Sequence, residues 1–274
     1  MNETVAIIGG GNLGCALARG LSTSGGVDRA SITVTRRSES GLEGLRDEGF
    51  KTTTDNRSAV SGASMIVVAV RPKQLNAVLD ELDGKLTNDR QLLVSTVSDA
   101  SLAHIERRIG TGIPVLRAMP NIGVAVGASM TCLAASSTVS RDVKGRAEAL
   151  FALLGQVEFI EEAQMTPATA LCACGVAFFL RAIRAASQGG VQVGFHADEA
   201  IRLAAQTAKG AAELVLASGQ HPEELIDSVT TPLGVTIAGL NEMEHQGFGS
   251  ALIRGIVLSA ERAGGLYPSR PSDE

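Results

Sequence analysis

Val5-Ala6-Ile7-Ile8-Gly9-Gly10-Gly11-Asn12-Leu13-Gly14 is the stretch of this 274-residue chain that decides its fold. Four consecutive apolar residues predict a buried strand, and a helical pattern over residues 13–22 follows the glycines. The spacing Gly9-x-Gly11-x-x-Gly14 at a strand-to-helix turn is the fingerprint of a Rossmann-type dinucleotide-binding unit. Gly9 permits the turn, Gly11 lets backbone approach a pyrophosphate, and Gly14 lets helix and strand pack closely. This placement disfavours a glycine turn without a ligand. We expect cofactor contacts from Gly9, Gly11, Asn12, Leu13 and Gly14.

Short β-branched runs continue through the first part of the chain and alternate with helical patterns. Runs that are apolar on both faces are typical of a mostly parallel sheet covered by helices on both sides. The predicted strands cover residues 4–8, 31–35, 64–70, 91–97, 114–118, 129–134 and 157–160. We therefore predict an α/β fold, with a doubly wound Rossmann-type parallel sheet in an amino-terminal domain of residues 1–162.

After residue 162 the strand patterns stop, and long segments rich in Ala and Leu follow. Glycines and Thr231-Pro232 separate these segments, as expected for helix ends. The predicted helices cover residues 166–188, 197–218, 222–230, 235–247 and 249–263. Several are apolar nearly all round, which indicates burial against a partner as well as within the chain. Residues 163–274 are therefore predicted to form an all-helical second domain.

Composition excludes several classes of function. The net charge of −5 provides no positive field for nucleic acid phosphates. With no Trp and one Tyr, the chain also has few rings on which bases could stack. No signal-peptide pattern occurs, and no apolar run reaches the roughly 20 residues that cross a bilayer. We expect no nucleic-acid partner, no membrane segment and a cytoplasmic location.

Four cysteines form no CxxC pair, which fits free thiols in a reducing compartment. Cys172 and Cys174 supply too few ligands for a metal, because one residue separates them and no His is near. We expect two small hydrophobic residues in a packed helix there, and no metal site.

The end of the second predicted strand discriminates between the two nicotinamide dinucleotides. An NAD site places an acidic residue there to bind the ribose 2′-hydroxyl, whereas this chain reads Arg36-Arg37-Ser38 and its nearest carboxylate is Glu39. Two guanidinium groups and a hydroxyl can hold a 2′-phosphate by charge-assisted hydrogen bonds. We predict that Arg36, Arg37 and Ser38 bind NADPH, with NADH bound more weakly. A solvated basic turn is the alternative.

Further motifs carry a resemblance to a known family. The most specific is Val229-Thr230-Thr231-Pro232-Leu233-Gly234-Val235-Thr236-Ile237-Ala238-Gly239-Leu240, after His221-Pro222. The others are Asp55-Asn56, Ala69-Val70-Arg71-Pro72, Arg117-Ala118-Met119-Pro120-Asn121 and residues 201–207. With the glycine loop, these motifs resemble pyrroline-5-carboxylate reductase from Val5 to about Gly265. The resemblance implies NAD(P)H-dependent reduction of the cyclic imine L-1-pyrroline-5-carboxylate to L-proline. It also implies homodimers formed through the helical dimerisation domain, which assemble up to a decamer.

The resemblance also implies roles for individual residues. Asn56 would contact the adenosine side of the cofactor, and Thr236, as the catalytic residue, would orient or protonate the imine nitrogen. The cofactor-binding segments would be Ala69, Val70, Arg71 and Pro72, and Met119, Pro120 and Asn121. The residues around the carboxylate of the imino acid would be Val229, Thr231, Gly234, Val235, Thr236 and Cys174.

Four segments depart from the family pattern. The family has Ser-Gly-Ser-Gly-Pro where this chain has Cys172-Ala173-Cys174-Gly175-Val176, and Ser-Pro-Gly-Gly where it has Thr231-Pro232-Leu233-Gly234. Val235 replaces Ala or Thr, and Asn121-Ile122-Gly123 replaces Asn-Thr-Pro. Two alternatives to the family reaction therefore stay open: a reductase of another cyclic imino acid, and a non-catalytic NADP-binding regulator.

Overall fold

The computed structural model describes residues 3–87, 91–110 and 112–264. Two compact units divide the chain: residues up to Cys174 together with those from Ser259 onward form an α/β unit, and Gly175–Leu258 form a helical unit. Each unit is described by itself below. The predicted domain boundary after residue 162 stays a prediction.

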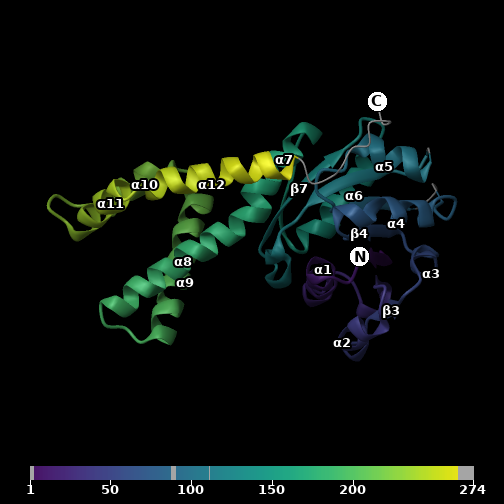
Figure 1. Ribbon diagram of the computed structural model, residues 1–274, viewed down its shortest axis with the longest axis horizontal. Coiled ribbons are helices and arrows are strands. Elements are labelled where there is room, and N and C mark those ends of the chain that lie inside the picture. Colours follow the sequence, from purple (N-terminus) through teal and green to yellow (C-terminus); the bar gives the residue numbers. More distant parts are fainter. Residues whose placement is uncertain (1–2, 88–90, 111, 265–274) are drawn as a thin grey trace. The chain divides into compact units, whose positions relative to one another are not determined.

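One sheet forms the centre of the α/β unit (Figure 1). Its strands are β1 (Val5–Ile8), β2 (Ile32–Thr35), β3 (Lys51–Thr53), β4 (Met65–Val68), β5 (Leu92–Ser95), β6 (Val115–Met119), β7 (Ser129–Ala135) and β8 (Gly155–Phe159). They lie in the order β3-β2-β1-β4-β5-β6-β7-β8, and every neighbouring pair is parallel except β6 with β7. The chain crosses from one side of β1 to the other between β3 and β4, as in a doubly wound sheet. The predicted fold class is therefore confirmed.

Helices cover both faces of this sheet because its strands are apolar on both faces. Val5 and Ile7 face one buried cluster, whereas Ala6 and Ile8 face the other. The first cluster takes in side chains of α1 (Asn12–Thr23), α2 (Glu43–Asp47) and α6 (Arg141–Ala152). The second takes in those of α3 (Asn56–Val60), α4 (Leu75–Leu82) and α5 (Leu102–Ile109). The sheet thus has a complete core of its own.

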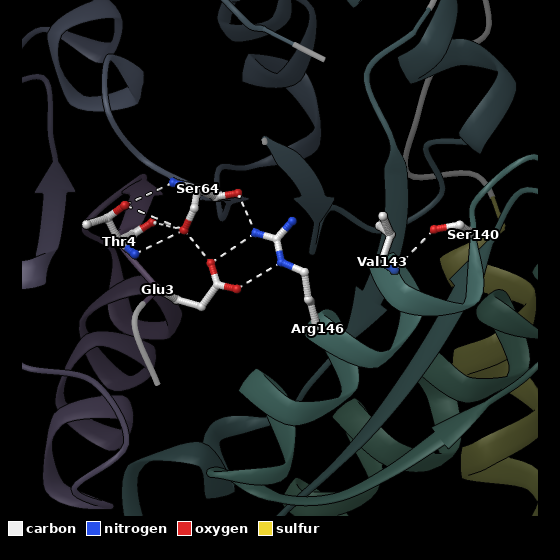
Figure 2. Close-up of polar contacts among 6 residues, drawn as sticks. All are labelled: Glu3, Thr4, Ser64, Ser140, Val143 and Arg146. Atoms are coloured by element: carbon white, nitrogen blue, oxygen red, sulfur yellow. Dashed lines mark hydrogen bonds and ion pairs between the residues drawn. The ribbon is translucent and has the colours of Figure 1, made fainter. Parts of the chain in front are cut away.

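A polar network holds the amino end of the sheet together (Figure 2). Arg146 of α6 makes two bonds to the carboxylate of Glu3, at 2.9 and 3.0 Å, and a third to the carbonyl oxygen of Ser64 at 3.2 Å. The Ser64 hydroxyl donates to the same carboxylate and accepts from the backbone N–H of Thr4. These bonds join the residues that precede β1 and β4 to α6. They lie at the edge of the sheet opposite the glycine loop.

The helical unit contains α8 (Gly175–Gln192), α9 (Ala197–Ser218), α10 (Pro222–Ser228) and α11 (Val235–His245); α12 (Phe248–Ala263) begins in it. α8 packs against α9, and Gly219 ends α9 in the left-handed conformation with φ of 65°. The predicted helical carboxyl-terminal region is confirmed. One expected helix, residues 166–188, is divided: α7 (Met165–Ala168) and a π-helical segment, Thr169–Cys174, precede α8.

One helical stretch bears on the expectation that no segment crosses a membrane, which stays a prediction. Glu162–Gln192 is long and apolar enough to cross a membrane, judged by length and composition alone. A single helix of this kind is weak evidence for a membrane, because core helices of soluble proteins reach the same length and hydropathy.

Candidate cofactor and substrate sites

The three glycines of the loop have two different roles, close packing within the protein and free space for a ligand. A Cβ atom at Gly9 would lie 2.6 Å from the carbonyl oxygen of Ala69, and one at Gly14 would lie 2.0 Å from that of Gly9. Both positions therefore require glycine for the protein's own packing. A Cβ atom at Gly11 would meet nothing within 4 Å. Gly11 is exposed, so the space above it is free for a ligand.

The amino terminus of α1 opens directly above this loop. Gly11 is its N-cap residue, and no described side chain caps the helix. The first turn thus offers backbone N–H groups without a helical partner, together with the positive end of the helix dipole. Such an arrangement binds phosphate. The protein's own groups therefore fit the pyrophosphate of a dinucleotide here, and the contacts predicted for Asn12 and Leu13 stay a prediction.

The carboxyl ends of three neighbouring strands meet at this loop. Ile8 of β1 is in register with Thr35 of β2 on one side and with Val68 of β4 on the other. The segments that begin at Gly9, Arg36 and Ala69 consequently start from one edge of the sheet, on both sides of its topological switch point. Open α/β sheets bind their ligands in this crevice.

The predicted phosphate-binding turn after β2 is exposed. Arg36 donates to the carbonyl oxygen of Gly41 at 3.1 Å, and the hydroxyls of Ser38 and Ser40 lie 2.8 Å apart. Arg37 makes no hydrogen bond or ion pair with the residues that the structure describes, and its guanidinium remains available. Glu39 is paired with Arg46 at 2.6 Å. The carboxylate that follows this turn most closely in the sequence is therefore already engaged.

Asn56 lies beside the end of β2 with both ends of its amide in use. Its Oδ1 accepts from the Thr35 hydroxyl at 2.7 Å, and its Nδ2 donates to Glu81 Oε2 at 2.6 Å. Glu81 belongs to α4, and no local pattern in the sequence connects it with Asn56. The structure thus adds Glu81 to the candidate site as the residue that orients Asn56.

The segment after β4 lies against the glycine loop. The backbone N–H of Ala69 donates to Ile8 at 2.8 Å, and Val70 packs against the second buried cluster. Arg71 is exposed and its N–H donates to Gln74 Oε1 at 3.3 Å, while Pro72 begins a short turn. Arg71 is consequently the member of this segment whose side chain is most open to a ligand.

The segment after β6 is buried, and its asparagine holds backbone rather than facing solvent. Met119 and Pro120 are buried beside it. Asn121 Oδ1 accepts from Gly123 N at 2.8 Å, and Asn121 Nδ2 donates to the carbonyl oxygen of Cys172 at 3.1 Å. Asn121 therefore fixes the shape of the turn after β6 and connects it to the π-helical segment.

The predicted substrate residues are mostly gathered in the helical unit, in the loop before α11. The loop closes through the N–H of Gly234, which donates to Thr231 O at 2.9 Å. Gly234 is the N-cap of α11 without a side-chain cap, and Thr236 is exposed in the first turn. Val229 and Val235 are exposed as well. Cys174 belongs to the α/β unit, so the structure brings together five of these six residues.

The doubly wound sheet, with a glycine loop at its topological switch point, defines a dinucleotide-binding protein with a Rossmann-type fold, and the chain adds a helical carboxyl-terminal region. The family model "Pyrroline-5-carboxylate reductase dimerisation" matches residues 162–266, and "NADP oxidoreductase coenzyme F420-dependent" matches residues 4–99. The first match supports a homo-oligomer formed through the helical region.

Individual relatives extend the match over the whole chain. It is 41% identical to pyrroline-5-carboxylate reductase 2 of Dictyostelium discoideum, over 96% of this chain and 92% of that one. Identity to reductase 1 of the same organism is 47% over 98% of this chain, which spans about half (51%) of that protein. A solved reductase structure from Coxiella burnetii is 31% identical, with a TM-score of 0.87 over 98% of this chain and 100% of that chain. The chain therefore belongs to the pyrroline-5-carboxylate reductase family.

Proposed function

We propose that this protein reduces L-1-pyrroline-5-carboxylate to L-proline with NADPH. The observation that carries the proposal is the identity of 41% to a curated reductase across 92% of that relative's length. The reaction adds a hydride to the imine carbon and a proton to the ring nitrogen. An iminium carbon is already electrophilic, so the protein has to hold it about 3–3.5 Å from the hydride donor and exclude water.

The exposed basic turn supports NADPH as the cofactor. Arg37 has no partner among the described residues, and Arg36 and Ser38 flank it. Because Arg46 engages Glu39, little negative charge faces a 2′-phosphate at this turn. NADPH, when bound, supplies the hydride; the chain's part is to hold the dinucleotide through the α1 terminus and these side chains. NADH lacks the 2′-phosphate and would bind more weakly.

The first turn of α11 is the proposed site of the substrate carboxylate. Its uncapped N–H groups suit an anion, and each charge–dipole contact contributes about 0.3–1 kcal/mol. Thr236 in the same turn is proposed to orient the imine nitrogen. A threonine hydroxyl is a poor acid, so it does not supply the proton by itself. A water molecule supplies the proton, and the Thr236 hydroxyl passes it on to the ring nitrogen.

The proposed assembly is a homodimer in the cytoplasm, with dimers associating up to a decamer. Large apolar side chains on the helical unit support burial by another copy, among them Leu216, which is 80% exposed. The matched dimerisation model covers the same region.

Leu233 and Val235 favour one second candidate, a reductase of a six-membered or substituted cyclic imino acid. Leu233 is fully exposed with φ of 59°, and Val235 is 91% exposed. Both apolar side chains border the proposed carboxylate site. Added bulk at this place would alter which ring fits.

NADPH oxidation by the purified protein tests the proposal, with NADH in parallel and a panel of cyclic imines. We expect the five-membered imine to be reduced fastest and NADPH to be preferred. Replacing Thr236 by Val should lower kcat by about a hundredfold, whereas Ser should retain most activity. A six-membered imine in first place would transfer the function to the second candidate. NADPH binding without turnover on any imine would leave a non-catalytic regulator.

A further inference from the structure

Two cysteines far apart in the sequence face each other in the α/β unit. The sulfur atoms of Cys132 on β7 and Cys172 in the π-helical segment lie 3.8 Å apart, within thiol hydrogen-bond distance. Cys132 is 5% exposed, whereas Cys172 is half-buried. A small solute can therefore reach Cys172, whereas Cys132 is buried.

This thiol pair adjoins the turn after β6. Cys132 is in register with Met119 across the β6–β7 pairing. The carbonyl oxygen of Cys172 accepts the hydrogen bond from Asn121 Nδ2 at 3.1 Å. Displacement of either cysteine would thus act on Met119 or Asn121, both of which we predict to contact the cofactor.

The contact between the sulfurs also favours ionisation of one of them. An ionised Cys172 accepts the hydrogen bond from the Cys132 S–H, and this bond lowers the pKa of the Cys172 thiol to about 7. Burial and the same bond raise the pKa of Cys132. Because the thiolate is the nucleophile, Cys172 is the member that reacts first with an oxidant. The half-buried position of Cys172 agrees with this order.

We propose that Cys132 and Cys172 are a modification site, a dithiol that a hydroperoxide converts to a disulfide. The Cys172 thiolate attacks the peroxide, the O–O bond breaks, and, with one proton taken up, water and a sulfenic acid form. Cys132 then attacks the Cys172 sulfur, the S–O bond breaks, and hydroxide leaves with the Cys132 proton as a second water. In sum, two thiols and one hydrogen peroxide give one disulfide and two waters.

Disulfide formation has to bring the two sulfur atoms closer together. Bonded sulfurs lie about 2.05 Å apart, so the pair must approach by roughly 1.8 Å. Cys172 lies in a short segment of six residues between two α-helices, whereas Cys132 is fixed in the sheet. The shift therefore falls on Cys172 and on its bond to Asn121. One consequence rests on the proposed function. We expect the oxidised protein to reduce its imine several-fold more slowly until a dithiol reductant restores the two thiols.

Peptide mapping without reduction tests the site independently of activity. The purified full chain is treated with hydrogen peroxide, free thiols are blocked, and the digest is analysed by mass spectrometry. We expect one linked pair of peptides, containing Cys132 and Cys172, with a mass lower by two hydrogen atoms and separated by reductant. Because this readout needs no turnover, it fails or succeeds separately from the proposed reductase activity.

Single replacements give matched controls. Cys132→Ser and Cys172→Ser should each abolish the linked pair, whereas Cys15→Ser should leave it unchanged. Cys132→Ser should instead accumulate sulfenic or sulfinic acid at Cys172. A disulfide through Cys174 or Cys15, over-oxidation of Cys172 beside a reduced Cys132 in the wild-type chain, or no loss of thiols would each overturn the proposal. The wild-type map decides the question even where a variant fails to fold.

Discussion

The α/β unit and the helical unit differ in how far their apolar side chains are buried. In the α/β unit, two clusters bury the side chains of both faces of the sheet. In Gly175–Leu258, Ala200 is the sole described hydrophobic residue that is buried, and side chains such as Leu216 and Leu214 are exposed. An exposed apolar surface of this extent marks an interaction site. The sheet supplies its own core, whereas the helices require a partner copy for theirs.

The largest expected effect comes from a glycine inside the self-sufficient unit. Gly14→Ala places a Cβ atom 2.0 Å from the carbonyl oxygen of Gly9, a backbone atom that cannot give way. We expect the free energy of unfolding to fall by about 3 kcal/mol, measured by denaturant titration without ligand. Gly11→Ala is the matched control, because its Cβ atom meets no protein atom. It should lower the unfolding free energy of the unliganded protein far less than Gly14→Ala does, since only an N-cap preference is lost, and should weaken NADPH binding instead. Equal destabilisation by both would contradict this division of tasks.

A charge on the helical unit should break association and leave the sheet folded. Leu216 is 80% exposed, so Leu216→Glu costs little within one copy but places a charge against the partner. We expect association to weaken by about 2 kcal/mol, roughly thirtyfold, in sedimentation at several concentrations. NADPH binding should persist.

Glu213→Gln provides the control for Leu216→Glu. Glu213 lies on the same helix and is 62% exposed, with only a 3.6 Å ion pair to Lys209. Removing its charge should leave the oligomer intact. If Leu216→Glu assembles as the unchanged protein does, this side chain is not covered by another copy.

On the α/β unit, the exposed side chains of the turn after β2 are polar, so their exposure points to a ligand and not to another copy of the chain. Arg37 is exposed, and the proposed function gives its guanidinium to the cofactor, just as it gives Leu216 to another copy of the chain. Arg37→Ala should raise the KM for NADPH about tenfold by removing a charge-assisted bond of about 1.4 kcal/mol. The KM for NADH should stay the same, because NADH lacks the phosphate. Steady-state kinetics with both cofactors measures the difference, and an equal change for the two would assign Arg37 to the solvated turn.

The same contrast explains what the sequence could predict. Strands such as Val5–Ile8 and Met65–Val68 are apolar on both faces, and local pattern alone locates them. The sequence pattern does not predict β3, because Lys51-Thr52-Thr53 is short, polar and at the sheet edge. The glycine loop was predictable because its constraints are local.

Contacts between distant segments were not predictable in this way. Glu81 reaches Asn56 from α4, and Cys132 of β7 meets Cys172 of the π-helical segment, 40 residues further along the chain. Neither pair leaves a periodic pattern in the sequence. The π-helical segment also escaped prediction, since Thr169–Cys174 has the composition of an ordinary helix. Residues whose role depends on tertiary register thus emerge only from the structure.

A smaller effect is expected at the opposite edge of the sheet, in the network of Figure 2. Arg146 and the Ser64 hydroxyl hold the pKa of Glu3 below its usual 4.5. A lowered pKa means stability that is fully present above the unfolded-state pKa and is lost as pH falls through the folded-state pKa. Glu3→Gln should therefore lower the free energy of unfolding by about 1 kcal/mol at pH 7, and the two proteins should converge in acid.

The Arg19–Glu48 pair tests whether distance or burial determines how much an ion pair contributes to stability. Its 2.6 Å distance is shorter than that of Arg146 and Glu3, but its side chains are 49% and 35% exposed, against 26% and 13%. Exposed pairs contribute little because water screens them and ordering two long side chains costs entropy. Glu48→Gln should consequently change the unfolding free energy by less than about 0.5 kcal/mol at any pH. A larger loss for Glu48→Gln than for Glu3→Gln would show that distance, not burial, sets the strength of these ion pairs.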